Sequence, residues 1–181
     1  MTASADGGTA PAVPTEMAPA PHRRILFFAV VVGANLQALD TTMATVALPH
    51  MQGALSATQD EITWVLASYL IAVAIVMPLV GTLAARLGRK RLFLIAIVGF
   101  CIASIFSGSA DNLFEIVVYR FMQGIFASPL VPISQSFVFD AFPTERRGRA
   151  MSWWSLGVMM GITIGPVLGG YVTEFHSWRW V

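Results

Sequence analysis

Two charged residues of opposite sign, Asp40 and Arg120, stand inside long apolar stretches of this sequence. An isolated charge in hydrocarbon costs at least about 2.5 to 3.5 kcal/mol, so both side chains are expected to face a polar interior. Asp40 lies about fifteen residues, or roughly 22 Å, into its stretch, and Arg120 lies at a similar depth in another. We therefore expect the two to pair, which would give a carboxylate that can exchange a proton next to a fixed cation.

Two glutamines accompany these charges. Gln37 is one helical turn from Asp40, and Gln123 is one turn from Arg120, so each shares a helix face with its charged neighbour. Gly124 adjoins the second pair and leaves room for a neighbouring helix. A static buried ion pair that only fixes helix packing is the alternative interpretation of this group.

The composition indicates that lipid surrounds most of the chain. Hydrophobic residues make up 56% of the 181 residues, and charged residues only 12%, where a soluble domain carries about 25%. A bilayer core about 30 Å thick needs about 20 helical residues. Five segments meet this requirement, and they lie near residues 25–48, 62–83, 92–110, 113–138 and 151–172. The sequence thus predicts an all-α integral membrane protein.

The flanks of these segments differ in charge. Nine of the eleven Lys and Arg residues fall on the side of the N-terminus, one falls on the other side, and Arg120 lies within a segment. By the positive-inside rule, the N-terminus is cytoplasmic. Residues 1–22, rich in Ala, Pro, Thr and Gly, are expected to form a disordered cytoplasmic tail. Residues 23–181 are expected to form a partial transmembrane bundle, truncated before a sixth span.

Glycines recur every four residues on the fifth segment. This spacing puts them in one stripe, along which another helix can approach closely. Pro166 and Gly170 are expected to weaken the outer end of the same segment. The stripe consists of Gly157, Gly161, Gly165 and Gly169. On spacing alone, a packing role is the simpler interpretation.

Prolines and glycines also mark two other places. Pro129 and Pro132 predict a kink in the fourth segment, because proline lacks a backbone donor. The connection from Gly81 to Arg91 has two glycines around a short turn and crowds four cations at the inner surface. Those cations are Arg86, Arg89, Lys90 and Arg91, with Gly88 among them. Positive-inside anchoring explains the charge, whereas a latch between helix bundles explains the glycine spacing, and both interpretations stay open here.

Several classes of protein are not indicated. The sequence has no phosphate-binding loop, no dinucleotide fingerprint and no His cluster with metal-ligand spacing, so no enzyme, cofactor or metal is expected. The basic residues lie in small groups between apolar runs, which argues against nucleic-acid binding. Cys101 stands alone in an apolar run and cannot form an internal disulfide.

With these motifs in view, the chain from about residue 24 onward resembles the major facilitator superfamily, in its fourteen-span drug:proton antiporter branch of EmrB- and QacA-like exporters. Residues 39–42 and 46–49 resemble the first-span motif of that branch, and residues 119–124 resemble the fourth-span motif. Gly81 to Arg91 resembles the loop motif, although Ala85 stands where an Asp is common. The glycine stripe with Pro166 and Gly170 resembles the fifth-span antiporter motif.

The resemblance implies proton-coupled efflux of small, amphipathic or drug-like molecules by alternating access, at the inner or plasma membrane. It implies that Asp40, Arg120, Gln37 and Gln123 couple proton and substrate movement, that the Gly81–Arg91 loop acts as an inner gate, and that no cofactor is needed. It also implies a membrane-fusion partner and an outer-membrane channel. A facilitator or importer of a specific metabolite, and a non-transporting membrane assembly module, are the alternative functions.

Overall fold

The predicted membrane segments form helices. The computed structural model describes the backbone of residues 20–181 and the side chains of residues 25–181. All regular elements in this part of the chain are helical: α1 (Ala20–Leu55), α2 (Gln59–Val76), η1 (Met77–Leu79), α3 (Val80–Leu87), α4 (Arg89–Gly108), α5 (Leu113–Ala127), α6 (Leu130–Ala141), α7 (Thr144–Phe175) and η2 (Trp178–Trp180). Of the tail predicted over residues 1–22, residues 1–19 lie outside the described part, and helix α1 begins at Ala20.

Five stretches of helix are long and apolar enough to cross a membrane. They are Ile25–Leu55, Gln59–Leu87, Arg89–Gly108, Leu113–Ala141 and Thr144–Phe175. Each contains most or all of one predicted segment. The described part of the chain is therefore an all-α, multi-pass membrane bundle.

Side-chain caps fix where two of these spans begin. Thr58 accepts a hydrogen bond from the Glu61 backbone N–H, and the Glu61 carboxylate accepts one from the Thr58 N–H, which completes a capping box at α2. Asn112 caps α5 in the same way by accepting from the Glu115 N–H at 2.9 Å. These caps satisfy backbone donors that a helix cannot satisfy itself, so they set sharp starts for α2 and α5.

Proline interrupts two spans, whereas α1 runs through Pro49 and α7 through Pro166. The fourth span breaks between α5 and α6 at Ser128 and Pro129, as predicted, and Pro132 lies within α6. The second span also changes to a 3-10 turn, η1, which contains Pro78. Helix α7, in contrast, runs through Pro166 to Phe175, so the expected weakening of its outer end is not observed as a break.

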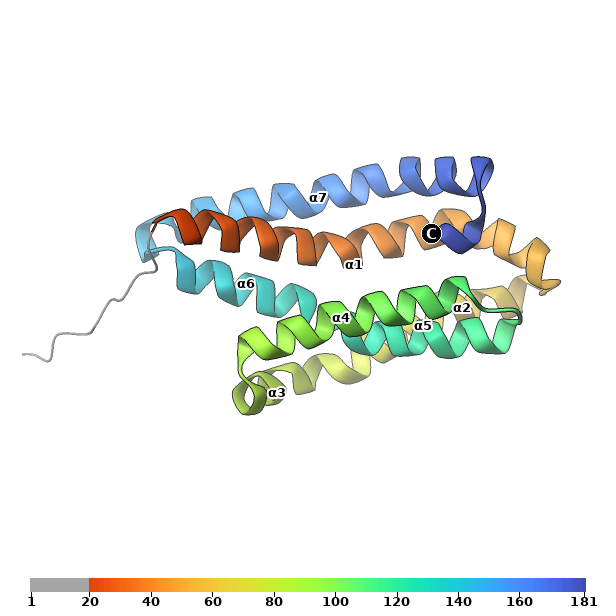
Figure 1. Ribbon diagram of the computed structural model, residues 1–181, viewed down its shortest axis with the longest axis horizontal. Helices are drawn as coiled ribbons and strands as arrows, with labels where there is room; N and C mark the ends of the chain where they lie inside the picture. The colour runs from red at the N-terminus through yellow and green to blue at the C-terminus, as the bar shows by residue number, and fades with distance from the viewer. Residues whose placement is uncertain (1–19) are drawn as a thin grey trace, which may run out of the picture.

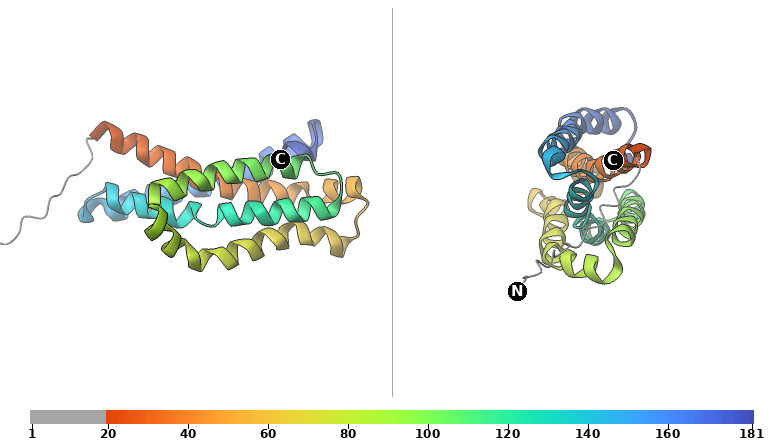
Figure 2. Two further views of the ribbon diagram at one scale, coloured as in Figure 1. Left: turned by 60° about the horizontal axis from the view of Figure 1, so that its bottom comes forward. Right: turned by 90° about the vertical axis from the view of Figure 1, so that its left-hand side faces the viewer.

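The helices pack in two neighbouring groups. Figure 1 shows α1 between α7 and α6, and the contacts between helices confirm both pairings. Helix α5 contacts α2 and α4 in the other group, and the end-on view of Figure 2 shows the two groups stacked. This arrangement puts α1, the helix of Asp40, beside the group that contains α5, the helix of Arg120.

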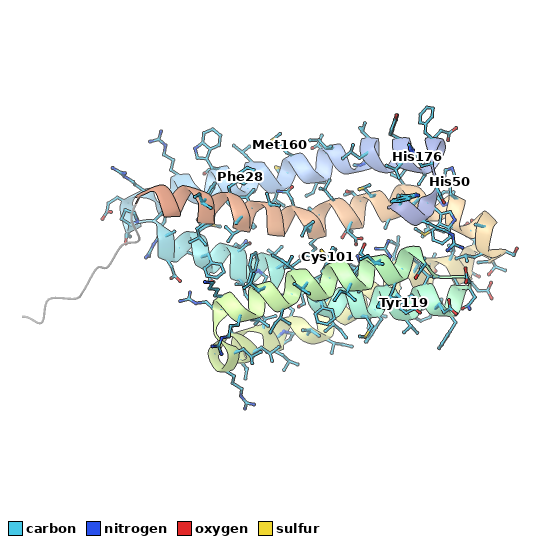
Figure 3. All side chains as sticks on the ribbon, viewed as in Figure 1. Phe28, His50, Cys101, Tyr119, Met160 and His176 are labelled. Atoms are coloured by element: carbon cyan, nitrogen blue, oxygen red, sulfur yellow. The ribbon has the colours of Figure 1, made fainter. Side chains whose placement is uncertain are left out.

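Large apolar side chains cover much of the outer surface. Phe28 on α1 is 71% exposed and Met160 on α7 is 62% exposed (Figure 3). His50 and His176 lie at one end of the bundle in the same view, at the ends of long helices. A water-soluble protein of this size would bury such an apolar surface, whereas a membrane protein turns it to lipid.

Candidate functional site

Asp40 and Arg120 meet inside the bundle. The Arg120 guanidinium donates from one nitrogen, Nη1, to both carboxylate oxygens of Asp40, at 3.0 Å to Oδ1 and 2.9 Å to Oδ2. The two side chains are only 7% and 4% exposed. A buried pair in this geometry costs desolvation energy, and the removal of either partner would leave an uncompensated charge in the interior. The predicted pairing across two spans is therefore observed.

Gln123 completes the contact, and Gln37 lies beside it. Gln123 is fully buried and donates from Nε2 to Asp40 Oδ1 at 2.9 Å, so the carboxylate accepts three hydrogen bonds from α5. The side chain of Gln37 lies close to the Tyr69 hydroxyl instead, as does that of Thr41. One glutamine thus touches the carboxylate directly, and the other belongs to the surroundings of Tyr69.

Some polar atoms around the pair are buried without a hydrogen-bond partner among the described residues. They are Arg120 Nε, Gln123 Oε1, Gln37 Oε1 and the Tyr69 hydroxyl oxygen. Unsatisfied polar atoms are costly in a buried site, where most such groups are paired. A site with spare donors and acceptors next to an ion pair can accommodate a change of its hydrogen bonds when the carboxylate gains a proton.

A cavity of about 120 Å³ opens onto the pair. Asp40 and Arg120 form its charged end, with Thr41, Thr45 and Tyr69 also in its lining, and the remaining lining side chains are aliphatic. Tyr69 was not among the residues singled out from sequence. Its type inside an apolar span was the available signal, because a tyrosine hydroxyl in a membrane interior needs a polar partner.

Helices α2 and α5 approach closely at Gly124, one turn after Arg120. A side chain at Gly124 would collide with the Tyr69 carbonyl oxygen and with Ala72 Cβ, so only glycine permits this approach. One turn further on, the Ser128 hydroxyl donates to the Val73 carbonyl at 3.3 Å. The space predicted at Gly124 is thus occupied by the backbone of α2.

The glycine stripe of α7 faces α1. Cβ atoms placed on the stripe would meet side chains or backbone of α1: Val31 at Gly157, Asn35 at Gly161, Thr42 at Gly165 and Met43 at Gly169. A Cβ on Gly170 would meet only Val46, at 3.9 Å, which is an ordinary contact. The predicted close approach is observed for the four stripe glycines, and the approaching helix is the one that carries Asp40.

The inner loop has one turn glycine rather than two. Gly88 has a φ of 83°, in the region that disfavours side chains, and it separates α3 from α4. Gly81 lies inside α3 with open space around it, which corrects the expectation that it flanks the turn. The residues that follow it, from Thr82 to Leu87, continue the helix, so Gly81 is a helical residue of α3 and not a turn residue.

The cations of this loop differ in their contacts. Arg89 forms an ion pair with Asp140 at the end of α6, and the two side chains are about half exposed. Arg86, Lys90 and Arg91 are exposed and form no ion pair among the described residues. Asp140 was missed from sequence. An acidic residue at the end of a span, close to the arginines that precede the next span, was the signal for it.

Comparison with known proteins agrees with this architecture. The family model described as Major Facilitator Superfamily matches residues 30–181. The chain is 38% identical over 157 residues to the multidrug export protein EmrB of Haemophilus influenzae, covering 87% of this chain and 31% of that protein. It is 41% identical over 146 residues to the fatty acid resistance protein FarB of Neisseria gonorrhoeae, covering 81% of this chain and 29% of that protein.

A third relative, the multidrug export protein EmrB of Escherichia coli, is also 38% identical over 157 residues. The chain spans about a third of the length of these relatives, since the matches cover 29% to 31% of them. The family match covers most of the chain, and it contains the paired charges, the glycine stripe and all helices except the first ten residues of α1. The chain therefore belongs to the major facilitator superfamily.

Proposed function

We propose that the protein to which this chain belongs exports small, amphipathic or drug-like molecules across the cytoplasmic membrane in exchange for protons. The observation that carries the proposal is the buried contact of Asp40 with Arg120 and Gln123, next to a cavity inside the membrane-spanning part. The relatives whose names describe multidrug export support the substrate class and the direction of transport. The proton gradient supplies the energy, so the mechanism needs no cofactor.

The chemistry of the site supports coupling to protons. Protonation of Asp40 removes the negative charge that faces Arg120 and turns one carboxylate oxygen from acceptor to donor. The ion pair then weakens, and the buried guanidinium needs another partner, which favours a rearrangement of α1 relative to α5. In alternating access, this change would reset the exporter, and release of the proton to the inside would restore the pair.

The driving force is adequate for export. One proton that enters through 100 mV and one pH unit releases about 3.7 kcal/mol, enough for a gradient of about 500-fold in a neutral substrate. For a monovalent cation exchanged one for one, the voltage contribution cancels and about tenfold remains. Substrate charge would thus decide how much of the gradient is usable.

The orientation and partners belong to the same proposal. The basic residues of the Gly81–Arg91 loop and of the start of α7 support a cytoplasmic location for this end of the bundle, where α1 also begins. A membrane-fusion protein and an outer-membrane channel would continue the export route. Affinity purification of the full-length protein with its neighbours cross-linked in the cell tests this part.

The experiment that tests the central proposal compares Asp40→Asn with Asp60→Asn in the full-length protein, reconstituted in vesicles. Both changes remove one carboxylate, but Asp60 is exposed in the first turn of α2 and lies outside the site. Asp40→Asn should abolish substrate-dependent proton movement while membrane insertion is preserved, and Asp60→Asn should retain it. Unchanged proton-coupled efflux in Asp40→Asn would remove Asp40 from the mechanism.

A protonophore separates the alternatives. Efflux against a gradient that stops on its addition indicates an antiporter, whereas flux that only follows the substrate gradient and is unaffected indicates a facilitator. Protein that inserts and assembles but moves no substrate under either condition would favour the membrane assembly module. Net uptake against a gradient would favour an importer.

A further inference from the structure

A second cavity lies at the basic end of the bundle, away from Asp40 and Arg120. Its volume is about 350 Å³, and it lies where the start of α7 meets α1 and the loop after α6. It is lined by Phe27, Phe142, Arg146, Arg149, Ala150 and Trp153. Two cations and three aromatic rings thus surround one open space.

The two cations are free to bind an anion. Arg146 and Arg149 are exposed, and neither forms an ion pair with the described residues. They lie three residues apart, so they project from the same face of α7. Arg147, between them, is occupied differently, because its Nε donates to the carbonyl oxygens of Phe139 and Phe142 at 3.0 and 3.2 Å. Arg147 therefore has a structural role, whereas the guanidinium groups of Arg146 and Arg149 can bind an anion.

Aromatic side chains build the apolar part of this cavity. Phe27 and Phe142 contact each other edge to face, with ring centroids 5.7 Å apart, and so join α1 to the loop before α7. Trp153 is 63% exposed, although it lines the cavity. Trp is typical of the level where lipid headgroups meet the hydrocarbon core.

An apolar track leads from the cavity along the membrane-spanning part of α7. Leu156 and Met160 follow Trp153 at intervals of three and four residues, so the three share one helix face. Leu156 is 53% exposed and Met160 is 62% exposed, and Figure 3 shows Met160 further along α7. A molecule with an anionic head in the cavity would have its apolar tail against this face.

We propose that this cavity binds the phosphate headgroup of an anionic phospholipid, with Arg146 and Arg149 on the phosphate and Trp153 against the first part of an acyl chain. Guanidinium groups match phosphate oxygens in geometry and charge, and basic pockets between membrane helices are suited to anionic headgroups. Free phosphate offers the same oxygen atoms. The continuous apolar face beyond Trp153 favours the lipid, because a free anion would leave that face unused.

The charge of the headgroup follows from the same contacts. A zwitterionic lipid would bring an ammonium group close to two arginines, whereas an anionic one brings only the phosphate and neutral groups. Preference for phosphatidylglycerol over phosphatidylcholine is therefore part of the proposal. The inference depends on the membrane location of the helices and not on the proposed transport activity.

The test is a lipid-binding titration of the purified full-length protein by native mass spectrometry. Short-chain phosphatidylglycerol is added to the unaltered protein and to Arg146→Gln, Arg149→Gln and Arg91→Gln. Loss of one charge-assisted contact, worth about 1.5 to 3 kcal/mol, should weaken the tightest lipid-binding step by about tenfold or more in the first two variants. Arg91→Gln removes the same charge from an exposed residue outside the cavity and should change this step by less than about twofold.

Two further arms separate the sources of phosphate and the lipid classes. Inorganic phosphate should not displace the bound lipid at millimolar concentration, and phosphatidylcholine should not compete at equal concentration. Displacement of lipid by inorganic phosphate would indicate a simple anion site and overturn the lipid assignment. An equal loss of binding in Arg91→Gln would show a general effect of charge and would overturn the site itself.

Discussion

Gly165 of α7 lies directly against Thr42 of α1, two residues after Asp40, at a distance that leaves no space for a side chain on the glycine. The Thr42 hydroxyl donates back to the carbonyl oxygens of Ala38 and Leu39 at 2.9 and 3.0 Å, so it is held against its own helix. The glycine stripe is thus in contact with the part of α1 that carries the proposed proton acceptor. A displacement of α7 here would move Asp40 relative to α5.

We expect Gly165→Ala to destabilise the protein by about 1 to 3 kcal/mol, because the added methyl group overpacks the contact with Thr42. Efflux by the full-length protein should fall as well, since α1 must shift to make room. Thermal unfolding and efflux in reconstituted vesicles measure the two effects.

Gly148→Ala is the matched control on the same helix. A Cβ on Gly148 meets nothing within 4 Å, and alanine is a better helix former than glycine, so its stability should be unchanged or slightly raised. If Gly165→Ala were as well tolerated as Gly148→Ala, the close α1–α7 contact would not matter to folding.

The Asp40–Arg120 pair predicts strong coupling between two mutations. Arg120→Gln leaves the buried carboxylate without its cation and should cost about 3 to 5 kcal/mol. Asp40→Asn added to the same chain should recover part of this loss, because no charge is then buried alone. Chemical unfolding of the two single variants and the double variant gives the coupling energy, and strictly additive losses would contradict the pairing.

The Arg89–Asp140 ion pair should affect transport more than stability. Its side chains are 48% and 52% exposed, and exposed pairs contribute only about 0 to 1 kcal/mol. If the inner loop acts as a latch, Asp140→Asn should slow transport with little change in thermal stability, and the exchanged pair Arg89→Asp with Asp140→Arg should restore it. Normal transport in Asp140→Asn would instead favour simple anchoring by positive charge.

Much of the architecture could be predicted because membrane helices follow from local sequence. The five spans depend on apolar length, the break at Pro129 depends on a missing backbone donor, and the α7 stripe depends on a four-residue period. The pairing of Asp40 with Arg120 was also accessible, since two charges at equal depth have few other partners. These features follow from local sequence and from the depth of each charge in the membrane, without knowledge of other contacts between distant residues.

Other features depend on three-dimensional neighbours that one sequence does not reveal. Asp140 becomes relevant only when the end of α6 meets the start of α4 at Arg89. Gln37 and Gln123 each lie one helical turn from a charged residue, so the sequence does not distinguish them. In the structure, Gln123 donates a hydrogen bond to the Asp40 carboxylate, whereas Gln37 lies beside Tyr69. Pro166 does not end α7, because proline within a membrane helix is tolerated when neighbouring groups satisfy the freed carbonyl.

Alanine substitutions at the two glycines of the Gly81–Arg91 segment should change the stability of the protein in opposite directions. Gly88→Ala forces a side chain into a φ of 83° and should cost about 1 kcal/mol or more, with a looser connection between α3 and α4. Gly81→Ala lies in a helix with open space around it and should be neutral or stabilising by up to about 1 kcal/mol. Thermal unfolding of the two variants in one membrane mimetic measures the difference. Equal losses from the two changes would mean that Gly81 contacts a part of the protein beyond the described residues, and its role would then be packing against that part rather than freedom of the backbone.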